Sequence, residues 1–194
     1  MGTIPTPFTE SDPLPRQARN FLSEIGLKWE NTLESAQENN IPVTILRFGV
    51  VLSKDGGALP KLAMPVKFGF GHTLSSGNQL FSWVHIDDLI SAINFLINHP
   101  EITGPVNIVA PQVINQRSFA LALGSALKRP IWLSFPTWLL ITVFGEMAQD
   151  LLLSGQGVTP EKLVKNGFNP IPHFPARSIG SEADLKDYTS MCKD

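Results

Sequence analysis

A nearly continuous apolar run at residues 43–52 constrains the fold of this chain more than any other segment. The run is rich in β-branched side chains and contains one charged residue, Arg47. Runs of this kind are typical of strands in a parallel sheet, because helices cover both faces of such a sheet. We therefore expect a strand here that is buried on both faces and is closed by a turn at residues 54–57.

Helical and strand-like patterns alternate along the rest of the chain. Apolar periodicity predicts helices over residues 20–39, 59–68, 89–97, 116–127 and about 136–153, and another from residue 159. Short apolar segments predict strands at 81–86, 104–110 and 133–135. Because helices separate the strands and no internal repeat occurs, the pattern favours an α/β fold over a helix bundle or a β-sandwich.

Charge and composition exclude several classes of partner and site. The net charge is −2 and Lys and Arg are scattered, so we expect no nucleic-acid partner. A single cysteine, Cys192, excludes an intrachain disulfide, and no cysteine or histidine spacing predicts a metal site. The apolar run at 130–145 is shorter than the roughly 18 residues that a membrane span needs.

The amino-terminal residues show neither the apolar core of a signal peptide nor the Arg-rich amphipathic pattern of a transit peptide. We therefore expect a cytoplasmic protein from the sequence as written. A plastid or mitochondrial location is expected instead if a targeting segment precedes these residues in a longer protein.

Three strings in the chain, taken together, resemble one family. They are ILRFGVVLSKDGGAL at 45–59, GNQLFSWVHIDDL at 77–89 and GPVNIVAP at 104–111. Shorter matches at 144–148, 151–156 and 166–168 extend the resemblance over about residues 20–180. The set is similar to the extended short-chain dehydrogenases/reductases (SDRs), and within them to the epimerase-family branch described as cell-division-inhibitor-like.

The resemblance implies a partial Rossmann-like parallel sheet and a small, mostly helical substrate-side domain. We expect an extended arm at 1–19, the carboxy-terminal part of the Rossmann-like domain at 20–115, the small domain at 116–180 and a tail at 181–194. No G-x-G-x-x-G string occurs in the sequence. We therefore expect an amino-terminally truncated chain that lacks the segment cradling the pyrophosphate of a dinucleotide.

The family implies NAD(P) as cofactor and a small or sugar-like molecule as substrate. SDR catalysis uses a Tyr-x-x-x-Lys pair, in which the ammonium group favours the phenolate that exchanges a proton with the substrate. The sole tyrosine, Tyr188, is followed four residues later by Cys192, and counting back from Trp29 places Leu22 and Gly26 at the positions of the pair. No catalytic residue is therefore assigned, and we expect the chain alone to bind NAD(P) poorly.

The resemblance also implies two groups of binding residues. Arg47 and Phe48 are expected at the cofactor, with Phe48 beside the nicotinamide, and Val50 is expected near the substrate. A polar and aromatic string follows a glycine-rich loop and faces the substrate cleft in the family. The members of this string are Gln79, Ser82, Trp83 and His85.

Structural roles compete with several of these assignments. An ion pair between Arg47 and an acid such as Asp88 would satisfy a buried guanidinium without any ligand. His85 can equally be a hydrogen-bonded core residue. Asp87 or Asp88 is interpreted as the cap of the following helix rather than as part of an acid/base pair. The glycines at 56–77 lack the strand–glycine–helix context of a phosphate loop, so we interpret them as turn residues.

Taken together, the sequence predicts an NAD(P)-dependent epimerase- or dehydratase-like SDR protein. Two alternatives stay open. A chain with part of its parent sheet should expose an apolar edge, which favours a non-catalytic protein that binds a partner or itself through that edge. The third interpretation is an inactive truncated isoform.

Overall fold

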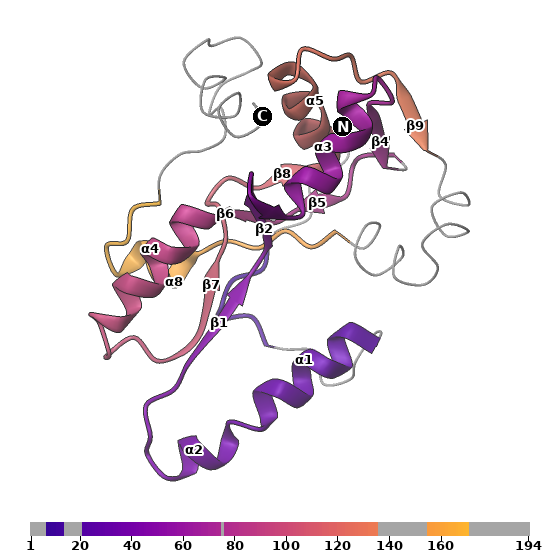
Figure 1. Cartoon of the computed structure of the whole chain (residues 1–194). Helices are drawn as coiled ribbons and strands as arrows, with labels where there is room; N and C mark the ends of the chain where they lie inside the picture. The colour runs from indigo at the N-terminus through magenta and orange to yellow at the C-terminus, as the bar shows by residue number, and fades with distance from the viewer. Residues whose placement is uncertain (1–6, 14–20, 75, 136–154, 171–194) are drawn as a thin grey trace.

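The structure is a computed structural model, and it describes residues 7–13, 21–74, 76–135 and 155–170 (Figure 1). Helices and parallel strands alternate along these residues, which confirms the α/β class. The helix expected at 136–153 and the tail at 181–194 lie outside the described residues.

The apolar run at 43–52 forms two strands rather than the single strand that we expected. Strand β1 (Thr44–Phe48) pairs in parallel with β7 (Gly104–Ile108), with Phe48 opposite Ile108. Strand β2 (Val50–Ser53) pairs in parallel with β6 (Trp83–His85) and in antiparallel with β3 (Gly56–Gly57). The run therefore changes its neighbour at Gly49, between β1 and β2.

Burial of this run on both faces was a wrong prediction. Every residue of β1 is partly buried or exposed, and 57% of Phe48 is exposed. Leu52 is the buried member of β2, and it is 1% exposed. The reason is the position of β1 in the sheet: among the described residues it pairs with β7 alone, so its second edge is open.

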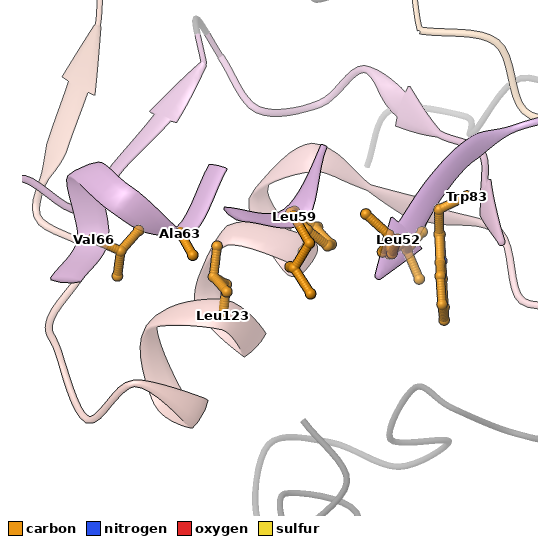
Figure 2. Close-up of a cluster of buried hydrophobic side chains, with 8 residues drawn as sticks. Leu52, Leu59, Ala63, Val66, Trp83 and Leu123 are labelled. Carbon is orange, nitrogen blue, oxygen red and sulfur yellow. The ribbon is translucent and has the colours of Figure 1, made fainter. Parts of the chain in front are cut away.

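The described core consists of two hydrophobic clusters on opposite faces of the strands. Helices α3 (Leu59–Lys67) and α5 (Gln116–Ala126) contribute to the first cluster, whose members include Leu52, Leu59, Ala63, Val66, Trp83 and Leu123 (Figure 2). Helices α4 (Ile86–Ile97) and α8 (Glu161–Lys165) cover the second cluster, whose members include Val84, Ala92, Leu96, Val106, Ile108 and Leu163. The consecutive residues Trp83 and Val84 enter different clusters, as the alternation of side chains along a strand requires.

Long-range pairing organises segments that look irregular in the sequence. The expected loop at 69–79 contains β4 (His72–Leu74), which pairs in parallel with β9 (Leu133–Phe135). The expected strand at 81–86 is divided into β5 (Leu80–Phe81) and β6, and β5 pairs in antiparallel with β8 (Ile114–Asn115). Local sequence carries little information on these pairs because each partner lies tens of residues away.

The first predicted helix is divided as well. It forms α1 (Phe21–Asn31) and the short α2 (Glu34–Glu38), separated by a turn at Thr32 and Leu33. The hydroxyl of Thr32 donates to the carbonyl of Trp29 at 2.6 Å. Such a bond to a nearby carbonyl competes with helix continuation, so the division has a local cause.

The change of neighbour at Gly49 predicts that no larger residue fits at this position. A Cβ atom there would lie 2.5 Å from the carbonyl oxygen of Ser82, which is a backbone atom and cannot rotate away. We expect Gly49→Ala to lower the free energy of unfolding by about 1–3 kcal/mol, measured by urea denaturation.

Gly26→Ala in α1 is the matched control for this substitution. No atom lies within 4 Å of a Cβ at Gly26, so we expect stability to be unchanged or raised by up to about 1 kcal/mol. Equal unfolding midpoints for the two variants would contradict the close approach at Gly49.

Candidate functional site

The candidate site lies where β1 gives way to β2, at a point we call the junction: Phe48–Val50 together with Ser82. The Gly49 N–H donates to the carbonyl of Ile108 at 3.4 Å, and the Val50 N–H donates to that of Ser82 at 2.9 Å. The Ala110 N–H donates to the carbonyl of Trp83 at 2.7 Å. These bonds bring β6 and the end of β7 to the junction, so two of the predicted groups of residues meet there.

Arg47 lies on β1 and is paired with a carboxylate. Its Nε donates to Glu30 Oε1 at 2.8 Å and its Nη2 donates to Glu30 Oε2 at 2.6 Å, an arrangement that uses both carboxylate oxygens. The structural alternative of an ion pair with an acid is therefore present, and the acid is Glu30 of α1 rather than Asp88, which was given as the example. Bidentate pairs of this kind fix geometry, and this one ties α1 to the edge strand β1.

Phe48 and Val50 differ in what surrounds them. The ring of Phe48 is largely exposed at the carboxyl end of β1. Val50 is partly buried and packs against the first hydrophobic cluster, with Trp83 opposite it in the strand register. Phe48 is thus open to a ligand, whereas Val50 contributes mainly to packing.

Ser82 connects the junction to a distant segment. Its hydroxyl donates to the carbonyl of Gln156 at 2.6 Å and accepts the N–H of Val158 at 3.1 Å. One side chain therefore satisfies two backbone groups of residues 155–158. This arrangement explains a polar residue between β5 and β6 without any ligand.

Gln79 lies at the start of the same string, and the segment at 155–157 runs close beside it. The carbonyl of Gln79 accepts the N–H of Gln116 at 2.9 Å. A Cβ at Gly155 would collide with the backbone of Leu80, and one at Gly157 with the Leu80 side chain. The segment therefore needs glycine at 155 to lie against the backbone of β5, whereas a larger residue at 157 would require the Leu80 side chain to move.

Trp83 and His85 are buried, at 2% and 8% exposed. Trp83 belongs to the first hydrophobic cluster. His85 is the N-cap of α4: its Nδ1 accepts the N–H of Asp87 at 3.2 Å. The expected capping by Asp87 or Asp88 was wrong, because both lie in the first turn of the helix, where their charge still favours its amino terminus.

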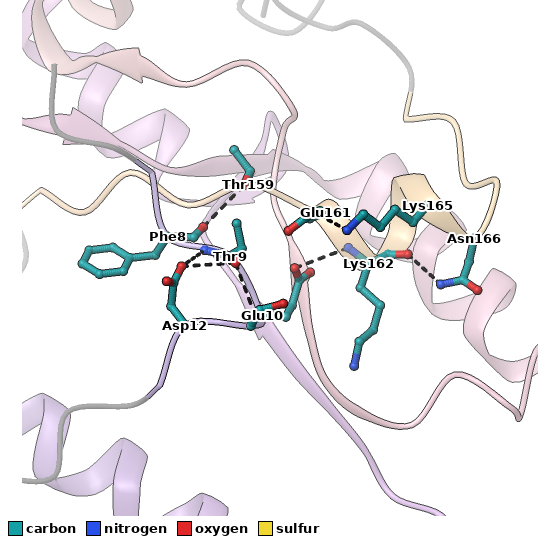
Figure 3. A network of polar contacts seen from close by, with 10 residues as sticks. Phe8, Thr9, Glu10, Asp12, Thr159, Glu161, Lys162, Lys165 and Asn166 are labelled. Carbon is teal, nitrogen blue, oxygen red and sulfur yellow. Dashed lines mark hydrogen bonds and ion pairs between the residues drawn. The ribbon is translucent and has the colours of Figure 1, made fainter.

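Reasoning from the sequence missed a polar network that Glu10 forms with β7 and α8, and Figure 3 shows its contact with Lys162 of α8. Its carboxylate accepts the N–H of Asn107 at 2.9 Å and that of Lys162 at 3.3 Å. The side chain of Asn107 in turn donates to the carbonyl of Thr159 at 3.1 Å. Asn107 was the available signal, because a buried polar residue in an apolar strand requires a partner.

The backbone of the arm continues this network. Phe8 donates its N–H to Gly157 at 2.8 Å and accepts the N–H of Thr159 at 2.9 Å. Phe8 and Val158 form a parallel bridge. Of the residues expected as an extended arm, Phe8 forms the bridge and residues 9–12 form a turn closed by the Asp12 N–H, which donates to the carbonyl of Thr9 at 3.3 Å. Phe8 holds the segment at 157–159 from the side opposite the contacts of the Ser82 hydroxyl with Gln156 and Val158.

Metal-binding groups and membrane-spanning helices were two further features sought among the described residues. None of their His, Cys, Asp and Glu side chains gather in threes or more with a geometry suited to a metal ion. No helix among them is long and apolar enough to cross a membrane.

Comparison with known sequences relates the chain to epimerase-family proteins. Residues 135–170 match a family described as "Domain of unknown function (DUF1731)". An epimerase family protein of Staphylococcus epidermidis is 40% identical over 149 residues, which cover 77% of this chain and 50% of that protein. The chain thus spans about half the length of the curated relatives it matches.

Solved structures share the fold. The human epimerase family protein SDR39U1 (isoform 2), crystallised with NADPH, is 28% identical with a TM-score of 0.79, and the match covers 98% of this chain and 61% of that one. The UDP-glucose 4-epimerase of Thermus thermophilus, in complex with NAD, has a TM-score of 0.65 at 14% identity, and the match covers 98% of this chain and 60% of that one. The second likeness bears on the fold alone.

The two hydrogen bonds of Ser82 can be tested directly. We expect Ser82→Ala to lower the free energy of unfolding by about 1–3 kcal/mol, because the groups of Gln156 and Val158 lose their partner. Hydrogen exchange of the Val158 amide should accelerate more than that of the α4 amides.

Ser91→Ala, at an exposed position of α4, is the control. It should change stability by no more than about 0.5 kcal/mol. Unchanged exchange at Val158 in Ser82→Ala would show that Ser82 does not hold this segment.

Proposed function

The chain belongs to the epimerase family of extended SDRs, and from this we propose that it forms the substrate-side half of an NAD(P)-dependent epimerase-like protein. Its junction forms the nicotinamide end of the cofactor site. The small domain proposed at 116–180 contains the matched residues 135–170 and covers the substrate.

One observation carries the proposal: the exposed ring of Phe48 at the carboxyl ends of two parallel strands. Phe48 and Ile108 are opposite each other where β1 and β7 both end. In open α/β sheets, ligands bind outside the carboxyl ends of the strands. A flat apolar ring at that edge fits the face of a nicotinamide, and 57% of Phe48 is exposed there.

The described residues fit one end of a dinucleotide better than the other. The ring of Phe48 would pack against the nicotinamide ring. Val50 and Ser82 would hold the backbone beside Phe48 in place through their hydrogen bond. Between β2 and α3 the described part has Gly56 and Gly57, but these form β3, which pairs back on β2, and not a G-x-G-x-x-G turn that could receive the pyrophosphate. We therefore propose that groups outside this part of the chain bind the phosphates.

The bound dinucleotide would supply hydride transfer. The residues of this chain are proposed to bind and orient, and none is assigned to proton transfer. Leu22 and Gly26 stand at the positions that the family motif gives to tyrosine and lysine. Neither side chain can donate or accept a proton.

A chimaera tests this proposal. The chain is fused to the half of the Staphylococcus epidermidis relative that it does not match, and NADPH binding is followed by nicotinamide fluorescence and melting temperature. We expect binding by the chimaera and a melting temperature that rises with NADPH concentration, as ligand linkage requires. The chain alone should show no shift. Phe48→Ala should weaken binding by the chimaera up to about 10-fold, because one aromatic contact is lost.

Phe70→Ala is the matched control, since 60% of Phe70 is exposed against 57% of Phe48. Its NADPH affinity should equal that of the unaltered chimaera. Equal affinities for all three proteins would place the nicotinamide away from Phe48 and reject the proposed cofactor contact.

A second candidate function is supported by the open edge of β1. Figure 1 shows α1 and α2 lying apart from the other helices, and the pair between Arg47 and Glu30 ties α1 to β1. Trp29 on α1 is 72% exposed. An open strand edge beside an exposed apolar helix favours a protein that binds a partner through this side. Sedimentation of the chain over a range of concentrations tests self-association, and a strictly monomeric chain would count against it.

A further inference from the structure

Acidic residues are absent from two long stretches of this acidic chain. Residues 56–86 and 102–145 contain no Asp or Glu, although the whole chain has 17 such residues and a net charge of −2. These stretches supply α3, β4, α5 and β9, which contact one another. Lys61, Lys67, Lys128 and Arg129 are exposed on these elements and the adjoining turn. This end of the molecule therefore carries positive charge without neighbouring carboxylates from its own elements.

Large apolar side chains are exposed at the same place. Met64 is 59% exposed, Phe68 74%, Phe70 60% and Trp132 71%. The indole Nε1 of Trp132 donates to the carbonyl of Gly69 at 3.1 Å, and its backbone N–H donates to that of Gly71 at 3.3 Å. These bonds join the end of α3 to the segment before β9. We call this group the basic-aromatic surface; its members are Lys61, Met64, Phe68, Phe70, Arg129 and Trp132.

The core beneath this surface is already complete. Leu59, Ala63 and Val66 of α3 are buried and face α5, as Figure 2 shows with Leu123. The exposed Lys61, Met64 and Phe68 alternate with them at spacings of three and four residues. The exposed aromatic residues are therefore not an unfinished part of the first hydrophobic cluster, and exposed apolar patches of this kind mark interaction sites.

We propose that the basic-aromatic surface docks on an anionic phospholipid bilayer. Aromatic and apolar side chains enter the boundary between headgroups and acyl chains, while Lys and Arg approach the lipid phosphates. Tryptophan suits this depth because its ring is apolar and its N–H is polar. Residues 56–86 and 102–135 carry no carboxylate that would repel anionic lipid from this face.

A second copy of the chain fits this surface less well. A two-fold contact would place the same cations of both copies against one another, since the same patch faces itself. Among the described residues, no carboxylate forms an ion pair with Lys61, Lys128 or Arg129 that could offset this repulsion. An anionic lipid surface attracts these Lys and Arg side chains, so no such repulsion arises.

Co-sedimentation with lipid vesicles tests the proposal. The chain is mixed with vesicles of phosphatidylcholine containing phosphatidylglycerol, or of phosphatidylcholine alone, at low and at physiological salt. We expect binding to the anionic vesicles that weakens as salt rises. Lys61→Gln combined with Arg129→Gln should weaken binding about 30-fold. Trp132→Ser, and independently Phe68→Ser, should weaken it about 10-fold.

Two matched controls separate this surface from general effects. Trp29→Ser removes a tryptophan that is 72% exposed on α1, against 71% for Trp132. Lys28→Gln combined with Lys165→Gln removes the same charge from α1 and α8. Both controls should bind anionic vesicles like the unaltered chain. Circular dichroism of every variant checks that the fold is retained.

Three results would overturn the proposal. The first is no binding to anionic vesicles, and the second is equal loss of binding in the test and control variants. The third is a concentration-dependent dimer that Trp132→Ser abolishes, which would assign the surface to a second copy. None of these results would change the affinity of the chimaera for NADPH. The lipid-docking proposal and the cofactor proposal can therefore be rejected independently of each other.

Discussion

Gly49 allows one run of chain to pair with two different neighbours. Before it, β1 pairs with β7, and after it, β2 pairs with β6. The change requires the backbone at Gly49 to approach that of Ser82 so closely that no side chain fits between them. The exposed Phe48, the end of β7 and the start of β6 all lie next to this approach. The candidate site is therefore a consequence of one backbone contact.

The polar side chains around this contact serve mainly to hold distant segments. Ser82 satisfies the backbone of residues 155–158, and Glu10 satisfies Asn107 and the first turn of α8. Buried backbone groups need partners, and in these places side chains provide them. The described residues 155–170 of the matched segment are thus fixed to the sheet by hydrogen bonds as well as by the packing of Leu163.

Several site residues show why the sequence alone could mislead. Arg47 required a partner, and the sequence predicted an ion pair but not that Glu30 provides it, because the position of α1 against β1 is a tertiary fact. Asp87 and Asp88 were expected as caps because the apolar helical pattern begins at residue 89. The helix in fact begins three residues earlier, at Ile86, so His85 at the end of β6 is the cap. The expected start of a helix at residue 116 was correct, and its cap is local, because Asn115 accepts the N–H of Ser118, three residues away.

The sequence by itself determined the α/β class, the helices α3 and α5, the strand β9 and the family, because these depend on local periodicity and on motif strings. The tertiary structure alone decided the division of the run at 43–52, the open edge of β1, and the pairing of β4 with β9 and of β5 with β8. Strand pairing joins residues far apart in sequence, and the backbone groups that make it are the same in every residue. Side-chain patterns therefore indicate that a strand exists, whereas its neighbour is decided only when the whole fold assembles.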